Sequence, residues 1–478
     1  MPLKVLVCGG GCSGSALAFW LSRLGHDVTV VEHHAAAQHA AGGLIDVGPH
    51  GAQVLERMGL LPVVREYFVP PSDTAFVDAG GQVKGTIAAA GGGGGCRSRY
   101  EIARGSLVKA LYGATADRAR WVFGKTVEGF DEGPDGVTVS FSDGDMQRYD
   151  MLVGADGQDS LVRRGMAGKG VGEGEGEGED PRVRVGVYEA YWSVPRTNDD
   201  IVSASGDGKT ATYHAPGGRV MTARTHGGAG RTQVRFLLRD DAGLAAAHAG
   251  RCSGTQQQEF VEERFADAGW QAGRFLAGMR MADDFYCREA VVVRTQRGRG
   301  RQRSVASASG SEGGRVVLVG DAAHCSAGAE AVFAGVGGGG GRGGAGGVGL
   351  VGAYVLAGQM ARTPGDLKAA TEAYGVVIRP FVDEVQGWTG RGGGGVGVGV
   401  GGEKMLGTVR RCAMPMGEWG VCVLRVVLAV ACFLRVPELL ARLMLLLPLS
   451  LDVSGGGGGG GERWKMPEYL ELQGEKMG

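Results

Sequence analysis

The chain has 478 residues, long enough for two or three domains with ample hydrophobic core. Its 50 basic and 51 acidic residues leave a net charge of -1, which excludes nucleic-acid binding driven by overall charge. The nine cysteines contain no C-x-x-C pair and lack the dense, even spacing of a secreted disulfide framework. We therefore expect a reducing, cytoplasmic compartment.

Glycine is the most unusual feature of the composition, with 92 residues, about 19% of the chain, where roughly 7% is usual. Runs of glycine bury no side chain and lose the most backbone entropy when they become ordered. We interpret them as flexible insertions between folded segments. They fall at residues 91–95, 172–179, 337–341, 392–402 and 455–461.

The chain begins with the pattern of a βαβ unit. Residues 4–8 and 28–31 are short apolar runs typical of buried parallel strands, and the residues between them have helical periodicity. We expect no signal peptide or transit segment, because none fits ahead of the first strand.

Gly9, Gly11 and Gly14 place a G-x-G-x-x-G pattern between the first strand and the helix. These glycines allow a tight turn, close approach of a pyrophosphate to the backbone, and close packing of helix on strand. The helix N-terminus favours the anionic pyrophosphate. Glu32 ends the second strand at the distance expected for the acid that binds a ribose hydroxyl. The unit predicts a dinucleotide site, and by itself it leaves FAD and NAD open.

Two later apolar runs, residues 149–153 and 316–319, are predicted as further buried strands, each followed by an acidic turn. Ligands of open α/β sheets bind beyond the carboxyl ends of the strands, so both turns are candidate cofactor contacts. The Asp321 carboxylate can accept hydrogen bonds from a polyol such as the ribityl chain of a flavin. The alternative is that Asp321 caps a short helix. The turn residues are Asp156, Gly157, Gly320 and Asp321.

The sequence pattern changes in the middle of the chain. Between residues 182 and 239, short runs of alternating polarity separated by turn signals predict antiparallel strands, and a helix is predicted at 256–268. Aromatic side chains in these strands either line a substrate pocket or fill the core. They are Tyr191, Trp192, Tyr213 and Phe236.

After a predicted helix at 376–386, an apolar tract occupies residues 421–451. Charges and prolines interrupt this tract, so it does not form a clean membrane-spanning helix. We predict two amphipathic helices, packed on the body of the protein or lying at a membrane surface, with a true span as a third alternative. The interrupting residues are Arg425, Arg435, Pro437, Glu438, Arg442 and Pro448.

Three segments resemble the group A FAD-dependent monooxygenases, the aromatic hydroxylase family that includes the tetracycline-modifying enzymes. "EIARGSLVKALYG" is similar to their Arg-x-x-Leu helix start, "YDMLVGADGQDSLVRR" to their Asp-Gly motif, and "VVLVGDAAH" to their Gly-Asp motif. The resemblance implies a flavin contact by Arg104, with a solvated helix start as the alternative, and another by Asp46. The FAD-binding residues it implies are Gly9, Gly11, Gly14, Glu32, Asp46, Arg104, Asp156, Gly157, Gly320 and Asp321.

The resemblance also implies the fold class. This is an α/β fold with a Rossmann-like FAD-binding domain of the GR2, p-hydroxybenzoate hydroxylase type. A mostly antiparallel β-sheet substrate domain is inserted into it, and a helical tail follows. The expected boundaries are 1–180 and 281–390 for the FAD-binding domain, 181–280 for the substrate domain, and 391–478 for a glycine-rich linker and tail.

The implied enzyme binds FAD, takes a hydride from NADPH or NADH, and uses O2 to insert one oxygen atom into a small organic, aromatic or polycyclic substrate. No catalytic side chain is assigned, because such a cofactor carries the reactive chemistry. Two alternatives stay open: a flavin-dependent reductase or dehydrogenase, and a non-catalytic FAD-binding module. The second arises because Ser326 stands where relatives commonly have proline, ahead of a glycine run.

The histidines predict no further chemistry. His324 lies in the Gly-Asp turn, where packing is favoured over acid–base catalysis. His33, His34 and His39 are close in sequence, but we identify no acid or cysteine that completes a metal set at ligand spacing. The sequence therefore predicts no metal site.

Overall fold

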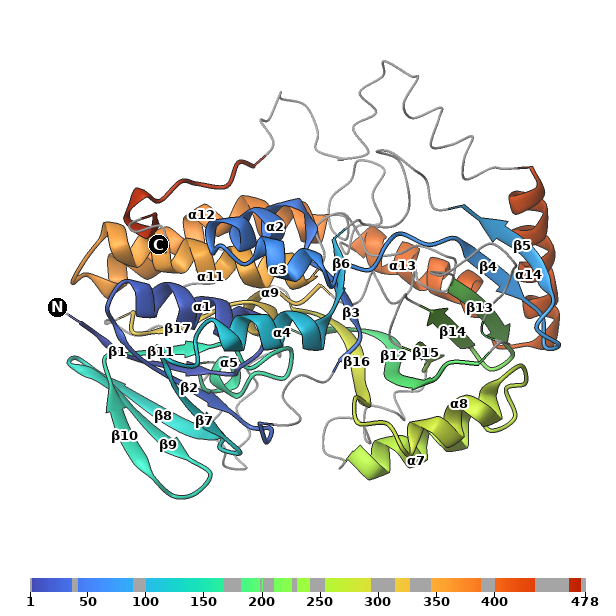
Figure 1. Ribbon diagram of the computed structural model, residues 1–478, viewed down its shortest axis with the longest axis horizontal. Helices are drawn as coiled ribbons and strands as arrows, with labels where there is room; N and C mark the ends of the chain where they lie inside the picture. The colour runs from blue at the N-terminus through green and yellow to red at the C-terminus, as the bar shows by residue number, and fades with distance from the viewer. Residues whose placement is uncertain are drawn as a thin grey trace, which may run out of the picture.

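A computed structural model shows two bodies side by side, with the helical layer of one on the left of Figure 1 and the larger sheet of the other on the right. The predicted glycine runs fall mostly outside the part of the chain that the structure describes. The described residues are 2–36, 42–88, 100–166, 182–197, 200, 210–225, 230–240, 254–293, 314–326, 345–387, 400–434 and 464–473.

The first body is built on a five-stranded sheet in the order β17-β11-β1-β2-β7, in which every neighbouring pair is parallel. Its strands are short apolar runs because layers on both faces exclude water from them. The strands are β1 (Lys4–Cys8), β2 (Asp27–Glu32), β7 (Arg120–Phe123), β11 (Met151–Gly154) and β17 (Val316–Leu318).

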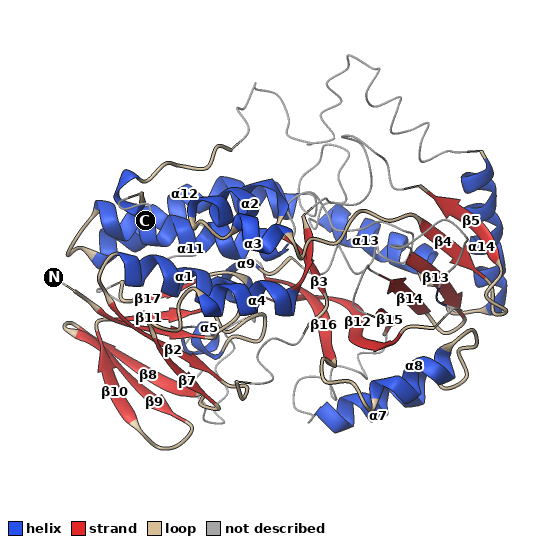
Figure 2. Ribbon diagram, in the orientation of Figure 1, coloured by secondary structure: helices blue, strands red, loops and turns tan. Residues whose placement is uncertain are grey.

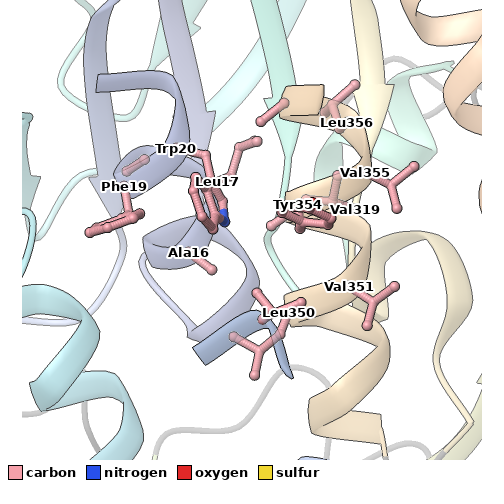
Figure 3. Packing of buried hydrophobic residues seen from close by; sticks show 14 of the residues in the cluster. Ala16, Leu17, Phe19, Trp20, Val319, Leu350, Val351, Tyr354, Val355 and Leu356 are labelled. Atoms are coloured by element: carbon pink, nitrogen blue, oxygen red, sulfur yellow. The ribbon is translucent and has the colours of Figure 1, made fainter. Parts of the chain in front are cut away.

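Helices cover one face of this sheet. In Figure 3, Leu17 and Trp20 of α1 face Leu350 and Tyr354 of α11, and the rings of Trp20 and Tyr354 meet edge to face at 5.4 Å between centroids. Burial of each such side chain is worth about 1.5–3 kcal/mol. The main helices of the layer are α1 (Cys12–Arg23), α2 (Gly48–Arg57), α11 (Ala345–Arg362) and α12 (Leu367–Gly387).

A three-stranded antiparallel sheet covers the other face. It contains β8 (Val127–Gly133), β9 (Gly136–Phe141) and β10 (Met146–Tyr149). Val137, Val139 and Phe141 alternate along β9 and pack against Leu6 and Leu152 of the parallel sheet. The first body therefore has three layers, and it is Rossmann-like, as the resemblance implies.

The second body contains a seven-stranded sheet in the order β16-β12-β15-β14-β13-β4-β5, in which only β13 and β4 pair in parallel. The predicted antiparallel sheet is therefore present, with α7 (Gly254–Phe265) and α8 (Ala272–Met279) on one face (Figure 2). Its strands are β4 (Thr74–Val77), β5 (Val83–Ile87), β12 (Arg182–Pro195), β13 (Thr210–Ala215), β14 (Arg219–Thr225), β15 (Arg231–Arg239) and β16 (Tyr286–Val293).

This sheet extends beyond the predicted substrate segment 181–280. Strands β4 and β5 come from the segment 1–180, and β16 comes from the segment 281–390. Local patterns do not reveal such pairing, because the partners are far apart in sequence. The boundaries at residues 180 and 280 remain a proposal. The seven-stranded sheet contains strands from all three segments that they separate.

Short elements join the two bodies and complete their edges. Strands β3 and β6 pair in antiparallel fashion beside the junction, with Asp46 opposite Glu101. The remaining elements are β3 (Leu44–Asp46), β6 (Glu101–Ala103), α3 (Leu61–Arg65), α4 (Arg104–Gly113), α5 (Leu161–Met166), α9 (Asp321–His324), α13 (Val400–Ala413), α14 (Glu418–Phe433) and η3 (Leu470–Leu472).

The C-terminal part differs from the expected linker and tail. Helix α13 begins inside the glycine run 392–402. Its last residue, Ala413, and the following Met414 pack against Val187 and Leu237 of the larger sheet. Helix α14 occupies the first half of the predicted apolar tract, whose second half lies outside the described residues. No single described helix is long and apolar enough to span a membrane.

The last described segment, residues 464–473, returns to the helical layer of the first body. Tyr469 is fully buried there, and its hydroxyl accepts a hydrogen bond from Gln359 Nε2 at 2.7 Å. A Cβ placed on Gly358 would lie 2.3 Å from the Tyr469 ring, so the ring packs directly on the α11 backbone. Residues 464–473 are therefore packed on the helical layer of the first body.

Replacing Tyr469 with alanine is expected to lower the free energy of unfolding by about 3–5 kcal/mol, because the truncation leaves a cavity against α11. Leu470 is the matched control: it is 73% exposed, and Leu470→Ala is expected to change the stability by less than about 0.5 kcal/mol. Urea denaturation of both variants measures the difference. Equal denaturation midpoints would show that the segment does not hold this position in solution.

Candidate active site

A cavity lies between the carboxyl ends of the parallel strands and the inner face of the seven-stranded sheet. Eight of the ten residues proposed from the sequence line it together, although they come from six separate parts of the chain. They are Gly9, Gly11, Glu32, Asp46, Arg104, Asp156, Gly157 and Asp321. The other two, Gly14 and Gly320, lie behind the lining and shape the turns.

The first glycine turn is formed by backbone contacts that leave no room for side chains. Gly9 has φ +106°, and a Cβ on it would lie 2.4 Å from the carbonyl oxygen of Ala155. A Cβ on Gly14 would lie 1.9 Å from the Gly9 carbonyl oxygen. Gly11 caps α1 without a side-chain hydrogen bond, so the helix N-terminus is open to an anion at the cavity.

Glu32 is buried at the end of β2 and is already well bonded. Its Oε2 accepts from the Gly10 N–H at 2.8 Å, and its Oε1 accepts from the His34 N–H at 2.9 Å. Burial favours a raised pKa, but hydrogen bonds from His33 and His34 outweigh it and hold the pKa of Glu32 well below its usual range. The carboxylate is therefore ionised and keeps lone pairs for a ribose hydroxyl.

The expectation about metal ligands needs a correction here. The ligand atoms of Glu32, His33 and His34 all lie within 4.8 Å of one another, so an acid does stand beside two of the histidines. Glu32, His33 and His34 are consecutive, whereas the ligands of metal motifs are usually spaced along the chain, so the sequence pattern does not indicate this group. His39 lies outside the described residues. We assign no metal to this group, since the Glu32 carboxylate is engaged by the glycine turn.

Asp156 follows β11 and organises the next turn. Its Oδ2 accepts from the backbone N–H groups of Leu161 at 2.7 Å and Val162 at 3.2 Å, at the start of α5. Arg163 then donates to the carbonyl oxygens of Ala322 at 2.6 Å and Gln158 at 2.5 Å. The Asp-Gly turn is therefore tied to the Gly-Asp turn, and both face the cavity.

At the Gly-Asp turn, Gly320 has φ +62°, and a Cβ on it would lie 2.0 Å from Ser13 Oγ. Gly320 itself is the N-cap of α9, so Asp321 is not the helix cap that the alternative proposed. The Asp321 carboxylate lines the cavity with no hydrogen bond from the described residues. Burial raises its pKa, opposed by Arg288 and Arg104, and its oxygens are available to a polyol.

Asp46 and Arg104 lie on the third side of the cavity. Asp46 Oδ1 accepts from the Gly48 N–H at 2.8 Å, which fixes the turn into α2. Arg104 begins α4 and is partly buried. The alternative that Arg104 is a solvated residue at a helix start is therefore not supported. A Cβ on Gly11 would lie 3.3 Å from Arg104 Nη2, so the guanidinium stands beside the glycine turn.

The opposite wall was largely missed from the sequence. Of the four predicted aromatic residues, only Tyr191 lines the cavity, whereas Trp192, Tyr213 and Phe236 are buried between the sheet and the helices α7 and α8. Successive residues of a strand point to opposite faces, which separates Tyr191 from Trp192. The other residues of this wall are Thr210, Thr222, Arg224, Gln233, Arg235, Tyr286 and Arg288.

Two arginines on this wall share one buried carboxylate. Glu189 is 1% exposed; Arg235 Nη2 lies 2.9 Å from its Oε1, and Arg288 Nη2 lies 3.7 Å from its Oε2. Tyr191 donates from its hydroxyl to Glu189 Oε2 at 2.5 Å. Burial favours a raised pKa for Glu189, but Arg235 and Arg288 lower it, so the group stays ionised. The cluster carries one positive charge in excess.

A second ion pair on the wall is balanced. Arg224 Nη1 lies 2.6 Å from Glu101 Oε2, and both side chains are buried. The excess positive charge therefore belongs to the cluster of Arg235, Arg288 and Glu189. Its sequence signal, an arginine within a strand that also contains buried apolar residues, can be interpreted only when the strand register is known.

His324 is 2% exposed and does not line the cavity. Neither ring nitrogen has a hydrogen-bond partner among the described residues, and burial lowers the pKa of the imidazole to about 3. The ring is neutral near pH 7. This placement agrees with the packing role that the sequence favours.

The buried imidazole is expected to make stability depend on pH. Its folded pKa lies below the unfolded value of about 6.5, so the unfolded chain binds more protons between the two, and stability falls as the pH drops through this window. When the pH is lowered from 7 to 5, the free energy of unfolding is expected to fall by about 2 kcal/mol more for the wild type than for His324→Phe. Denaturation of both proteins at the two pH values measures this; parallel losses would contradict it.

The fold and these contacts define a dinucleotide-binding flavoprotein. The glycine turn opens a helix N-terminus to a pyrophosphate, and the free Asp321 carboxylate suits a ribityl chain, so the residues present fit FAD. The loop that the sequence questioned, from residue 327 to 344, lies outside the described residues.

Comparisons with known proteins agree with this class. Residues 2–234 match the family model for an FAD binding domain. The chain is 30% identical to the FAD-dependent monooxygenase asL4 of Sarocladium schorii, over 99% of this chain and 100% of that protein. It resembles the structure of tetracycline destructase Tet(51), with a TM-score of 0.65 and 23% identity over 90% of this chain and 98% of that one.

A third comparison extends the fold assignment. The structure of Klebsiella pneumoniae HpxO complexed with FAD and uric acid aligns with a TM-score of 0.58 and 20% identity, covering 94% of this chain and 98% of that one. The chain belongs to the group A FAD-dependent monooxygenases and has their p-hydroxybenzoate hydroxylase-like fold. It is an FAD-dependent oxidoreductase.

Proposed function

We propose that the protein uses NADPH or NADH and O2 to insert one oxygen atom into a small aromatic or polycyclic substrate. One oxygen atom of O2 enters the substrate and the other leaves as water. The nicotinamide supplies the two electrons as a hydride, and solvent supplies one further proton. The observation that supports this is a single cavity, with FAD-binding turns on one wall and the cationic sheet on the other.

Bound FAD supplies the redox chemistry in this proposal. We propose that Gly9, Gly11 and the N-terminus of α1 hold its pyrophosphate, and that Glu32 binds the ribose. Asp321 binds the ribityl chain, while Arg104 and Asp46 lie beside the ring system. Asp156 and Gly157 complete the pocket by ordering the turn after β11. The sheet closes the opposite side and excludes water, which favours charge interactions within the site.

We propose that the substrate presents an acidic oxygen to the cluster of Arg235, Arg288 and Glu189. One buried carboxylate does not balance two partly buried guanidinium groups, so a phenolate, enolate or carboxylate oxygen completes the charge. Tyr191 adds an aromatic surface, and its ring contacts the backbone of Gly43 on the FAD side. A planar acidic ring system between these groups fits such a wall.

Oxygen-isotope labelling tests the reaction. The FAD-loaded protein is incubated with NADPH and 18O2 and a panel of phenols, aromatic acids and polycyclic enols, and mass spectrometry measures the products. We expect a gain of one 18O atom in an acidic substrate. Reduction or dehydrogenation of the substrate without 18O would favour the flavin-dependent reductase. Bound FAD with no NAD(P)H oxidation across the panel would favour the non-catalytic module.

A further inference from the structure

Two polar side chains on the sheet wall of the cavity have no partner within the described part of the protein. Gln233 of β15 and Thr222 of β14 both line the cavity, and both are partly buried. Among the described residues, neither the Gln233 amide nor the Thr222 hydroxyl takes part in a hydrogen bond. Their hydrogen-bonding groups are therefore available to a molecule in the cavity.

The residues beside Gln233 on the two neighbouring strands already have partners. Arg224 lies opposite Gln233 on β14, and its Nη1 donates to Glu101 Oε2 at 2.6 Å. Ser193 lies opposite Gln233 on β12, and its hydroxyl donates to Asp284 Oδ2 at 2.6 Å. The Gln233 amide therefore keeps its two N–H donors and its carbonyl acceptor for a ligand.

Thr222 stands close enough to Gln233 for one ligand group to contact both. Thr222 lies opposite Arg235 in the sheet, two positions along from the pair of Arg224 and Gln233. Thr222 and Gln233 are therefore diagonal neighbours on one face, about 7–8 Å apart between their backbones, a gap that long side chains can bridge. The Arg235 guanidinium between them is engaged by Glu189, at 2.9 Å from Nη2 to Oε1.

This pair of groups is separate from the cationic cluster and differs from it in charge. Gln233 comes two residues before Arg235 on β15, which separates them by about 7 Å along the strand. The ion pair next to Gln233 is balanced, because Arg224 is matched by Glu101. An amide and a hydroxyl beside a balanced pair suit a neutral oxygen, since no charge remains there for a second anion.

We propose that Gln233 and Thr222 form a second substrate subsite, which binds a neutral carbonyl or hydroxyl oxygen about 7 Å from the acidic oxygen at the cationic cluster. This inference rests on the proposed function and narrows its substrate class. The substrate is a polyoxygenated compound with oxygens at opposite ends of a planar ring system, because oxygens on neighbouring ring carbons are too close together to reach both positions. Gln233 and Thr222 thereby determine which acidic substrates fit.

Binding of two naphthols to the full, FAD-loaded chain tests the subsite. 2-Naphthol has one phenolic oxygen, and 2,6-dihydroxynaphthalene has a second one at the far end of the same ring system. Titration without nicotinamide, followed by the change in flavin absorbance, measures both dissociation constants. We expect the wild type to bind the dihydroxy compound about 5-fold more tightly, and this ratio to fall to about 1 in Gln233→Leu.

Gln53→Leu is the matched control. Gln53 is exposed on α2 and does not line the cavity, so this variant should keep the wild-type ratio. Thr222→Val removes only the hydroxyl and should also lower the ratio, so it decides the test if Gln233→Leu does not fold. Flavin absorbance and the thermal midpoint show which variants keep the fold.

Equal affinities of the wild type for the two naphthols, or an unchanged ratio in both Gln233→Leu and Thr222→Val, would overturn the subsite. Arg235→Met separates this outcome from a failure of the proposed function, because loss of the cationic cluster should weaken both naphthols by a similar factor. Naphthol affinities that do not respond to Arg235→Met would contradict the acidic-oxygen site, while their ratio still tests the subsite. No binding of either naphthol to the wild type would overturn both.

Discussion

Replacing Gly14 with alanine is expected to abolish detectable FAD binding, raising the dissociation constant at least about 100-fold, or roughly 3 kcal/mol. The added Cβ would lie 1.9 Å from the Gly9 carbonyl oxygen, so the start of α1 must move away from the turn. Gly9 has little room to move away, because it has φ +106° and packs so closely on Ala155 that a Cβ built on Gly9 would lie 2.4 Å from the Ala155 carbonyl oxygen. The pyrophosphate then loses the helix N-terminus that binds it.

The matched control is Gly113→Ala. Gly113 ends α4, and a Cβ on it would meet nothing within 4 Å. This variant is expected to fold normally and to bind FAD like the wild type, since alanine is the better helix former. Absorbance after reconstitution, with titration of free FAD by fluorescence, measures both. A yellow Gly14→Ala protein with wild-type affinity would contradict the role of this turn.

The second large effect is expected from Arg235→Met. In this variant FAD should stay bound, while kcat/KM for oxygenation falls about 100-fold or more. The reason is that removing one partner from a buried charged cluster costs roughly 2–5 kcal/mol. Arg235 lies directly opposite Tyr191 in the sheet and donates to Glu189. Its loss leaves Arg288 as the remaining cation facing the substrate oxygen.

Arg231→Met is the control on the same strand. Arg231 is partly exposed and pairs with Asp283 at the surface, at 2.9 Å, so its loss should change kcat/KM less than about threefold. Steady-state assays at several substrate concentrations separate KM from kcat, and flavin absorbance verifies that each variant holds FAD. Equal kinetics for Arg235→Met and the wild type would show that the substrate does not contact this wall.

The side of the cavity formed by the turns after the parallel strands, which we propose binds FAD, could be predicted because its sequence motifs are local. Gly9, Gly11 and Gly14 are read together within a few residues, and Asp156 and Asp321 each follow a short apolar strand directly. Parallel strands bring their carboxyl ends to one edge of a sheet, so these separate turns meet without further information. The sequence therefore contained most of the cofactor side of the cavity.

The substrate wall could not be predicted in the same way. Its charged cluster exists only through the register that sets Glu189 opposite Arg288 and Tyr191 opposite Arg235. A shift of one residue would send the same side chains to the other face. The recruitment of β4 and β5 depends on pairing with β13, more than a hundred residues away, which periodicity does not report.

The start of α13 within a glycine run shows a related limit. Glycine has a low helix propensity, so the composition of residues 392–402 predicts a linker. Tertiary packing of Ala413 and Met414 overrides that preference at the other end of the helix. Propensity describes a segment by itself, whereas the sheet surface that α13 covers is assembled from distant strands.

An anaerobic flavin titration tests the central claim most directly. The chain is reconstituted with FAD, titrated with NADPH and then with NADH in the presence of the acidic substrate identified by labelling, and finally exposed to O2. The account predicts a flavin spectrum, its bleaching by stoichiometric nicotinamide, and its return with one oxygenated product for each nicotinamide consumed. A chain that folds but shows no flavin absorbance after reconstitution would contradict the account.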